Sequence, residues 1–269
     1  MNIEEKDFQR LKAYMQKNFG LNLEKKQTLV EGRLSNVIAQ AGYDNFHDYI
    51  DAAINDKTGQ MLTLLTTKLT TNYSYFMREE AHYNFLSKVA LPEWTGKIRD
   101  NDLRIWSAGC SSGDEAYTTA IVVNEYFGSL KSKWDTTILA TDISDRALNE
   151  ARAAVYAESR LDKLPPLWKQ KYFTKEGAEE YRVNPSIAKE VVFARYNLMD
   201  PFDRFKRKFH VIFCRNVMIY FDTPTKTELA RKFCDVLEPG GYLFIGLSET
   251  ISGMESRFKQ VASAIYRKG

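Results

Sequence analysis

The stretch from Leu103 to Tyr117 restricts the possible folds of this chain more than any other. An alternating, apolar-rich run ends at Gly109 and Gly113, and a helical pattern follows. This order predicts a strand, a tight turn and the start of a helix. We expect Gly109 to adopt the unusual backbone angles of the turn, and Gly113 to let the helix and a ligand approach closely. Ligands of open α/β sheets bind where a strand ends and a helix begins, although an ordinary turn without a ligand fits this stretch almost as well.

The residues after the turn restrict the kind of ligand. The two glycines lack the G-x-G-x-x-G spacing of dinucleotide sites, so a nicotinamide cofactor is not favoured. Asp114 and Glu115 follow directly, and their negative charges would repel a phosphate. The turn therefore favours a ligand that carries positive charge.

Composition excludes several classes of protein. The chain has 269 residues, 44% hydrophobic and 27% charged, which is typical of a soluble globular protein with one or two domains. Its net charge of +3 is too small to indicate a nucleic-acid partner. No apolar run could cross a membrane, and Met1–Glu5 has no signal-peptide profile, so we expect no membrane insertion. Cys110, Cys214 and Cys234 lack the spacing of a zinc site, which favours a reducing cytoplasm and no metal.

The first hundred residues have the periodicity of helices and no pattern typical of strands. Apolar residues at helical spacing predict helices around Phe8–Met15, Val30–Ala41, Phe46–Ala53 and Leu62–Leu69. Gly20 follows the first as a stop, and Asp44 can cap the third. A further helix is expected from about Glu79 to Val89, because the proline after Leu91 disfavours continuation.

From Leu103 onward, short apolar strands alternate with helices, which predicts a doubly wound α/β sheet. The expected core strands are the run before Gly109, Thr137–Thr141, Val191–Arg195, Phe209–Cys214 and Tyr242–Leu247. Thr223 and Pro224 can begin a helix as its cap and first residue, and Pro239–Gly241 is expected to stop it. The last residues, Phe258–Tyr266, can add one or two antiparallel edge strands.

Four strand ends carry Gly109, Asp142, Asn197 and Asn216, and a doubly wound sheet brings them to one edge. An acid after the second strand can accept from both ribose hydroxyls, and asparagines can both donate and accept at an adenine or a ribose. Asp142 could equally belong to a helix cap, and each asparagine to a turn, but together they favour a nucleoside site. No Ser-His-Asp order and no metal-spaced cluster accompanies them, so no catalytic acid–base residue is evident.

Five stretches repeat, in order, the motifs of one family. Thr70–Glu79 (Thr-Thr-Asn-Tyr-Ser-Tyr-Phe-Met-Arg-Glu) is similar to T-T-N-x-T-x-F-F-R-E, and Trp106–Tyr117 is similar to W-S-A-x-C-S-x-G-E-E-P-Y. The others are Ala140–Ser144, Asn197-Leu198 and Cys214–Phe221. Together they cover nearly the whole chain, which thereby resembles the chemotaxis receptor methyltransferases of the CheR family.

The resemblance implies an α/β fold: a Rossmann-like, seven-stranded S-adenosylmethionine-dependent methyltransferase sheet with a small N-terminal all-α domain and a small β-subdomain insert. The expected divisions are a helical domain at 1–74, an interdomain linker helix at 75–100 and a methyltransferase domain at 101–269, with the insert at about 172–194. The insert lacks the glycine-rich loop of members that bind a receptor's C-terminal pentapeptide.

The family transfers a methyl group from S-adenosylmethionine to glutamate side chains on the cytoplasmic helical domain of methyl-accepting chemotaxis receptors. The products are glutamate methyl esters and S-adenosylhomocysteine. By resemblance, the methionyl part is held by Asn72, Ser74, Arg78 and Glu115, the ribose by Asp142, and the nucleoside by Asn197, Leu198, Asn216 and Val217. A glutamate is already ionised at neutral pH, so positioning can replace a catalytic base and we expect no catalytic residue.

The basic residues Lys25, Lys26 and Arg33 lie near the second predicted helix. Charge alone favours a solvated surface for them. Beside an active site that modifies glutamates, however, we expect them to bind the receptor substrate, and we expect a monomer without nucleic acid. Two alternatives remain open: an S-adenosylmethionine-dependent methyltransferase of another substrate, and a non-catalytic S-adenosylmethionine-binding signalling adaptor.

Overall fold

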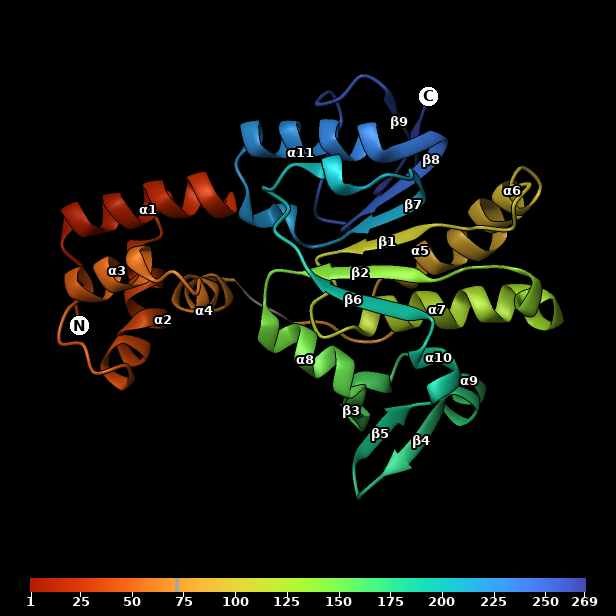
Figure 1. The fold of residues 1–269 in the computed structure, drawn as a ribbon, viewed down its shortest axis with the longest axis horizontal. Coiled ribbons are helices and arrows are strands. Elements are labelled where there is room, and N and C mark those ends of the chain that lie inside the picture. The colour runs from red at the N-terminus through yellow and green to blue at the C-terminus, as the bar shows by residue number, and fades with distance from the viewer. Residues whose placement is uncertain (71–72) are drawn as a thin grey trace.

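The computed structural model describes residues 1–70 and 73–269. A group of helices at the N-terminus lies beside a twisted sheet that carries helices on both faces, and a second, smaller sheet lies below it (Figure 1). None of the described helices is long and apolar enough to cross a membrane.

The N-terminal helices are α1 (Glu5–Phe19), α2 (Gln27–Gln40), α3 (Phe46–Asn55) and α4 (Gln60–Leu69). These confirm the predicted helices, and α1 ends at Gly20 in the left-handed conformation. The predicted cap of α3 is wrong by one residue. Asn45, not Asp44, is the cap, since its side chain accepts a hydrogen bond from the Asp48 N–H at 2.9 Å.

The segment that follows is helical through α5 (Glu80–Phe85), the π-helical turn η1 (Leu86–Ala90) and α6 (Leu91–Thr95). The prediction that this helix ends before Leu91-Pro92 is wrong. Proline has no N–H and crowds the carbonyl four residues earlier, which a regular helix cannot relieve. Here the wider turn takes up the strain, because the Leu91 N–H bonds to the Leu86 carbonyl five residues back.

The large sheet has seven strands in the order β6-β2-β1-β7-β8-β10-β9. Pairing is parallel from β6 to β8, and β10 runs antiparallel to both of its neighbours. This confirms the predicted doubly wound sheet, and the last two strands add to it by antiparallel pairing, with β9 at the edge. The strands are β1 (Ile105–Ala108), β2 (Ile138–Asp142), β6 (Val191–Arg195), β7 (Phe209–Cys214), β8 (Leu237–Ile245), β9 (Phe258–Ala262) and β10 (Ile265–Lys268).

Helix α11 (Thr223–Val236) covers one face of the sheet, and α7 (Asp114–Phe127) and α8 (Asp145–Ala153) cover the other (Figure 1). The cap of α11 is Asp222 rather than Thr223, because the Asp222 carboxylate accepts from the Thr225 N–H at 2.9 Å. Pro239–Gly241 lies inside β8 and not at the end of this helix. The shorter helices are η2 (Gly128–Lys133), η3 (Glu158–Leu161), α9 (Pro166–Tyr172), α10 (Pro185–Ala188), η4 (Phe202–Arg204) and η5 (Met218–Tyr220).

The small sheet contains β3 (Val155–Ala157), β4 (Phe173–Glu176) and β5 (Glu180–Val183) in the antiparallel order β3-β5-β4 (Figure 1). It therefore begins earlier in the chain than the expected insert at 172–194. The end of that range also differs, because Val191–Arg195 forms β6 of the large sheet. A three-residue strand such as β3 is too short to show an alternating pattern in the sequence.

The N-terminal helices and the large sheet share one hydrophobic core. A continuous cluster of buried side chains runs from Met15 and Leu21 to Trp106 of β1 and Phe233 of α11. Leu21 also forms a β-bridge with Phe221, just beyond the end of β7. The helices are thereby fixed against the edge at which the parallel strands end.

Candidate functional site

A cavity of about 340 Å³ lies where the carboxyl ends of β1, β2, β6 and β7 face the N-terminal helices. The predicted cofactor residues within the described chain all line this cavity: Ser74, Arg78, Glu115, Asp142, Asn197, Leu198, Asn216 and Val217. Asn72 falls outside the described residues. The fold thus brings together side chains that lie far apart in the sequence, while their contact with a cofactor stays a prediction.

The two glycines of the β1–α7 turn have different roles. A Cβ on Gly109, at φ 87°, would lie 2.5 Å from Cγ2 of Val217, so only glycine lets these two strand-end loops meet. Gly113, at φ 92°, does not line the cavity. A Cβ there would lie 2.9 Å from Cβ of Ala151 and 3.0 Å from the Tyr156 hydroxyl. The glycine fits the start of α7 against α8 and β3, and its expected contact with a ligand stays a prediction.

The carboxylate of Asp142 joins two loops at the edge of the cavity. One oxygen accepts from the Ser111 N–H at 2.8 Å and the other from the Ser144 N–H at 2.9 Å. Burial raises the pKa of Asp142, and these N–H donors oppose that shift. The cap of α8 is Ser144, which accepts from the Ala147 N–H, so Asp142 is not itself that cap. Each carboxylate oxygen has two acceptor lone pairs, which leaves capacity for a ligand hydroxyl.

Glu115 lies in the first turn of α7 and is held by two partners. Its carboxylate accepts from the Ser107 hydroxyl at 2.7 Å and from the Arg215 guanidinium at 2.9 Å. Burial raises the pKa of Glu115, whereas the nearby guanidinium lowers it. Its negative charge is therefore paired inside the protein.

Arg215, directly after β7, was not assigned a role from the sequence. Its side chain is 2% exposed. Besides Glu115, it donates to the Tyr83 hydroxyl at 3.1 Å, to Glu79 at 3.2 Å and to the carbonyl of Arg78. It thus fastens the segment before α5 to the end of the sheet. A permanently charged residue at the end of the apolar run 209–214 was the signal that could have identified it.

Arg78 itself donates to the carbonyl of Tyr73 at 2.7 Å. Among the described residues, no carboxylate forms an ion pair with its guanidinium, although Arg78 lines the cavity. A guanidinium at a cavity wall is suited to a carboxylate of a ligand, because it can donate two parallel hydrogen bonds to it. Ser74 lies on the same wall and can add a hydroxyl.

The two asparagines differ in how they are used. The Asn216 backbone has φ 59°, and its N–H donates to the buried carboxylate of Glu249 at 3.0 Å. Glu249 also accepts from the Ile219 N–H at 3.0 Å, so this carboxylate shapes the loop after β7. The side chain of Asn197 donates to the carbonyl of Asn18 at 2.8 Å and accepts from the Met199 N–H at 3.0 Å. Asn197 therefore has the turn role considered above, and it also joins the sheet to α1.

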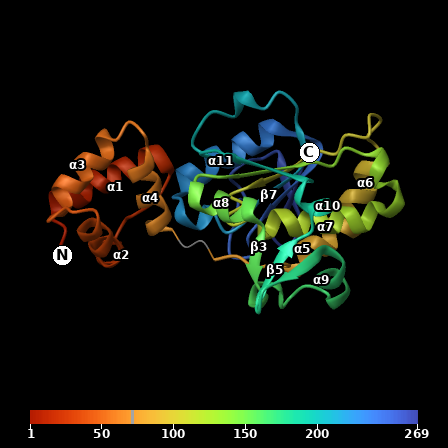
Figure 2. The ribbon, with the colours of Figure 1, turned by 60° about the horizontal axis from the view of Figure 1, so that its bottom comes forward.

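Part of the cavity wall comes from the N-terminal helices. Phe19, Leu21, Thr66 and Thr70 all line it, and none of them was a predicted site residue. Phe19, Leu21 and Thr66 lie far from the strand ends in the sequence and carry no motif, so only the packing of α1 and α4 against the sheet reveals them. Thr70 begins the motif at Thr70–Glu79 but was not among the residues expected to bind the cofactor. Figure 2 shows these helices beside the edge of the sheet.

The predicted substrate-binding cations are not gathered at the cavity. Lys25 is exposed in the loop before α2, and Lys26 immediately precedes that helix. Arg33 is half-buried, and it donates to the carbonyls of Lys68 and Thr70 at 3.2 Å each. Arg33 lines a second cavity, which adjoins the first.

The chemistry of the main cavity is that of a charged, partly apolar ligand. Carboxylates suit amino and hydroxyl groups, Arg78 suits a carboxylate, and Phe19, Leu21 and Val217 supply apolar walls. Burial raises the pKa of the Cys110 thiol, so this lining residue stays protonated. No group of three or more described His, Cys, Asp or Glu residues could hold a metal ion.

Two family models match the chain in succession. The CheR methyltransferase all-alpha domain matches residues 6–70, and the CheR methyltransferase SAM binding domain matches residues 72–267. A chemotaxis protein methyltransferase of Borreliella burgdorferi is 42% identical over 100% of this chain and 96% of its own length. Chemotaxis protein methyltransferase 1 of Pseudomonas aeruginosa is 32% identical over 99% of both chains, and that of Escherichia coli is 32% identical over 98% of this chain and 91% of its own. The sequence motifs, the cavity at the strand ends and these relatives agree: the chain belongs to the CheR family of methyltransferases.

Proposed function

We propose that this protein transfers the methyl group of S-adenosylmethionine to glutamate side chains of a methyl-accepting chemotaxis receptor, forming methyl esters. The cavity is the observation that carries the proposal. It collects Arg78, Glu115 and Asp142 within one apolar-walled space at the strand ends. These three side chains are complementary to a zwitterionic methionyl group and a ribose, because a cation suits the carboxylate and carboxylates suit the amino and hydroxyl groups.

Different residues of the cavity would bind different parts of S-adenosylmethionine. Arg78 and Ser74 would hold the methionyl carboxylate, Glu115 the amino group and Asp142 the ribose hydroxyls. Leu198, Val217 and Phe19 would enclose the nucleoside, beside Asn197 and Asn216. S-adenosylmethionine, when bound, supplies a methyl group on a positively charged sulfur.

Positioning would account for most of the rate. The ionised carboxylate of the acceptor glutamate needs no base, and it must approach the methyl group in line with the sulfur. The N-terminal helices would exclude water from this point. A site of low polarity favours the reaction, because the positive sulfur and the negative carboxylate neutralise each other. No side chain of this protein would take up a proton, and S-adenosylhomocysteine would leave as the second product.

We also propose that the chain is divided into two domains and a linker. A helical domain over 1–74 and a linker helix over 75–100 would precede the methyltransferase domain at 101–269. The meeting of the two family models between residues 70 and 72 supports a division near this point. The protein would act as a monomer in the cytoplasm, on the helical cytoplasmic domain of the receptor.

The test uses purified protein, methyl-labelled S-adenosylmethionine and the cytoplasmic fragment of a receptor from the same bacterium. Label should enter the fragment and be released as volatile methanol in mild alkali, which is the signature of a methyl ester. A fragment with its acceptor glutamates changed to alanine is the control and should stay unlabelled. Calorimetric binding of S-adenosylhomocysteine without any transfer would instead support a methyltransferase of another substrate or a non-catalytic adaptor.

A further inference from the structure

A second cavity, of about 400 Å³, adjoins the first. It lies between α2 and α4 on one side and the start of α8 and the glycine turn on the other. Thr70 and Ser111 line both cavities, so the two spaces meet along these residues. We call this second space the interdomain groove. A protein segment that reaches the main cavity from this side must pass along it.

Cations dominate the groove. It is lined by Arg33 of α2, Lys68 of α4 and Arg146 of α8, against one carboxylate, Glu150. Arg33 is held at the end of α4 by the carbonyls of Lys68 and Thr70. Among the described residues, no carboxylate forms an ion pair with the half-buried Lys68.

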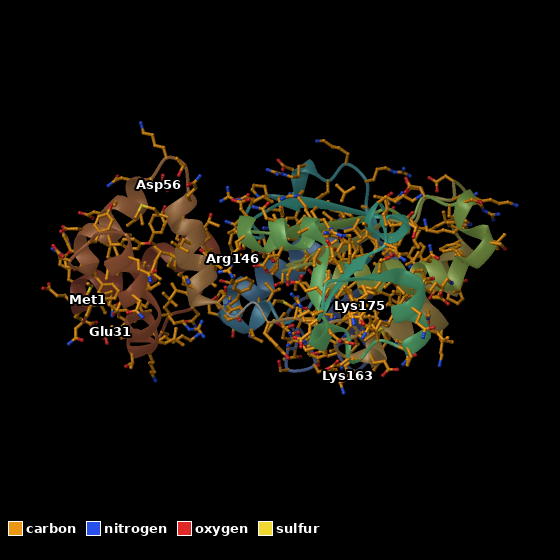
Figure 3. The ribbon with its side chains drawn as sticks, turned by 90° about the horizontal axis from the view of Figure 1, so that it is seen from below. Met1, Glu31, Asp56, Arg146, Lys163 and Lys175 are labelled. Atoms are coloured by element: carbon orange, nitrogen blue, oxygen red, sulfur yellow. The ribbon has the colours of Figure 1, made fainter. Side chains whose placement is uncertain are left out.

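Arg146 reaches into solvent from the opposite wall. Its side chain is 77% exposed and pairs with Glu150 one turn later in α8, at 3.1 Å. Figure 3 labels it on the side of the sheet that faces the N-terminal helices. The groove therefore presents charge from both walls, and a chain lying in it would meet Lys68 on one side and Arg146 on the other.

Hydroxyl groups occupy the space between the cations. Thr67, Ser111 and Ser144 all line the groove, and the Thr67 hydroxyl donates to that of Ser144 at 3.2 Å. Within the described residues, the buried hydroxyl of Ser111 has no hydrogen-bond partner. A hydroxyl without a partner at the junction of two cavities points to a ligand that accepts hydrogen bonds there.

We propose that the interdomain groove binds an acidic side chain of the substrate protein, one that flanks the methyl-accepting glutamate on the same segment. This inference rests on the proposed function. Cations from both walls, with hydroxyl donors between them, are complementary to a carboxylate. The exposure of Arg146 favours a solvated side chain at the surface of a protein partner over a fully enclosed small anion. The groove would thus favour protein segments that carry a second acidic side chain besides the glutamate that enters the main cavity.

The test reverses two cations of the groove in Lys68→Glu and Arg146→Glu, because neither side chain donates to a backbone carbonyl of the described residues. Arg33 is left intact, because it holds the end of α4. The matched control is Lys133→Glu, since Lys133 is an exposed lysine of η2 before the start of β2, at the opposite edge of the sheet. The probe is the receptor cytoplasmic fragment described above, and the readouts are KM, kcat and the Kd of S-adenosylhomocysteine.

Each reversal should raise the KM for the fragment roughly fivefold to tenfold at low salt, because an attraction becomes a repulsion. The difference should shrink at high salt, which screens exposed charges. kcat and the Kd of S-adenosylhomocysteine should change less than about twofold, as for the control. Lys68→Gln, which introduces no new charge at the end of α4, should give a smaller increase of the same sign.

A reciprocal change identifies the contact. Acidic residues that flank the acceptor are changed to lysine one at a time, and one of these fragments should be methylated better by Lys68→Glu or Arg146→Glu than by the wild-type protein. The inference is overturned if both reversals match Lys133→Glu in KM while the wild-type protein methylates the fragment. If the wild-type protein transfers no methyl group to the fragment, the proposed function itself fails, and the two failures are thus distinguished.

Discussion

Arg215 and Glu115 form an ion pair with 2.9 Å between Nη1 and Oε2, and both residues line the cavity. The same guanidinium holds Glu79 and the backbone of Arg78. A single buried cation therefore links an expected ligand of the methionyl amino group to the segment that carries an expected ligand of the methionyl carboxylate. The geometry of both depends on it.

Arg215→Met should lower the free energy of unfolding by about 3–5 kcal/mol, because it leaves Glu115 and Glu79 buried without their cation. Urea unfolding followed by circular dichroism measures this loss. Adding Glu115→Gln should recover part of it. The control is Arg207→Met, which removes an exposed arginine paired with Asp100 and should cost no more than about 1 kcal/mol. Equal losses in the two single variants would contradict the role given to Arg215.

Asp142→Asn should weaken binding of S-adenosylhomocysteine about tenfold or more, because a charge-assisted bond to a hydroxyl contributes roughly 1.5–3 kcal/mol. The amide also places an NH₂ group against one of the two backbone N–H donors that Asp142 accepts. Isothermal calorimetry measures the affinity, with Asp145→Asn, one residue into α8, as the control. Unchanged affinity in a folded Asp142→Asn protein would remove this carboxylate from the ribose site.

Arg78→Lys should weaken S-adenosylhomocysteine about tenfold, since an ammonium cannot reproduce the two parallel bonds that a guanidinium makes to a carboxylate. The control is Arg99→Lys, at an exposed arginine that does not line the cavity. Calorimetry on both variants, with S-adenosylhomocysteine as titrant, gives the comparison. Wild-type affinity in Arg78→Lys would mean that the segment before α5 does not form this clamp.

Phe19→Ala tests whether the N-terminal helices help to build the cofactor site. Loss of the ring should weaken S-adenosylhomocysteine about fivefold to thirtyfold, corresponding to roughly 1–2 kcal/mol of apolar contact. Leu29→Ala is the control, because Leu29 is 37% exposed on α2 and does not line the cavity. If the two variants bind equally well, the helices contribute only to the fold and to substrate docking.

Stability should depend on pH through His82, which burial and the nearby Arg215 bring to a pKa of about 4. The unfolded chain, with a histidine pKa of about 6.5, binds more protons between these values. Folding stability should therefore rise from pH 4 to 6.5, by about 3 kcal/mol for this residue, and be lost as the pH falls.

His82→Phe removes that proton and should flatten the dependence by up to about 1.4 kcal/mol per pH unit. His210, whose pKa is also lowered to about 4, remains as an internal reference. Urea unfolding at intervals from pH 4.5 to 7 measures both slopes. Identical slopes in the two proteins would show that His82 does not exchange a proton on unfolding.

Local signals predicted most of the elements, and packing decided the rest. Alternation and glycine placement gave the strand ends at which Asp142 and Asn216 lie, because side-chain period and turn chemistry are properties of neighbouring residues. Arg215 and Glu249 were not found, since the roles described for them depend on partners thirty or more residues away, Glu115 for the first and Asn216 and Ile219 for the second. The contribution of Phe19 to the cavity wall could not be predicted for the same reason, because no local sequence pattern relates α1 to the sheet.

The cavity wall contributed by α1 has a consequence for how such proteins can be recombined. The family models divide the chain near residue 71, yet Phe19 and Leu21 lie on one side of that division and Val217 and Phe221 on the other, around a single cavity. A chimera joined at this point inherits the wall of the proposed cofactor cavity partly from each parent. It keeps the full affinity only when the parents agree at contacts such as Asn18–Asn197 and Gln16–Thr225. Residues on the two sides of the division are far apart in sequence but contact each other, so a substitution on one side calls for a matching substitution on the other.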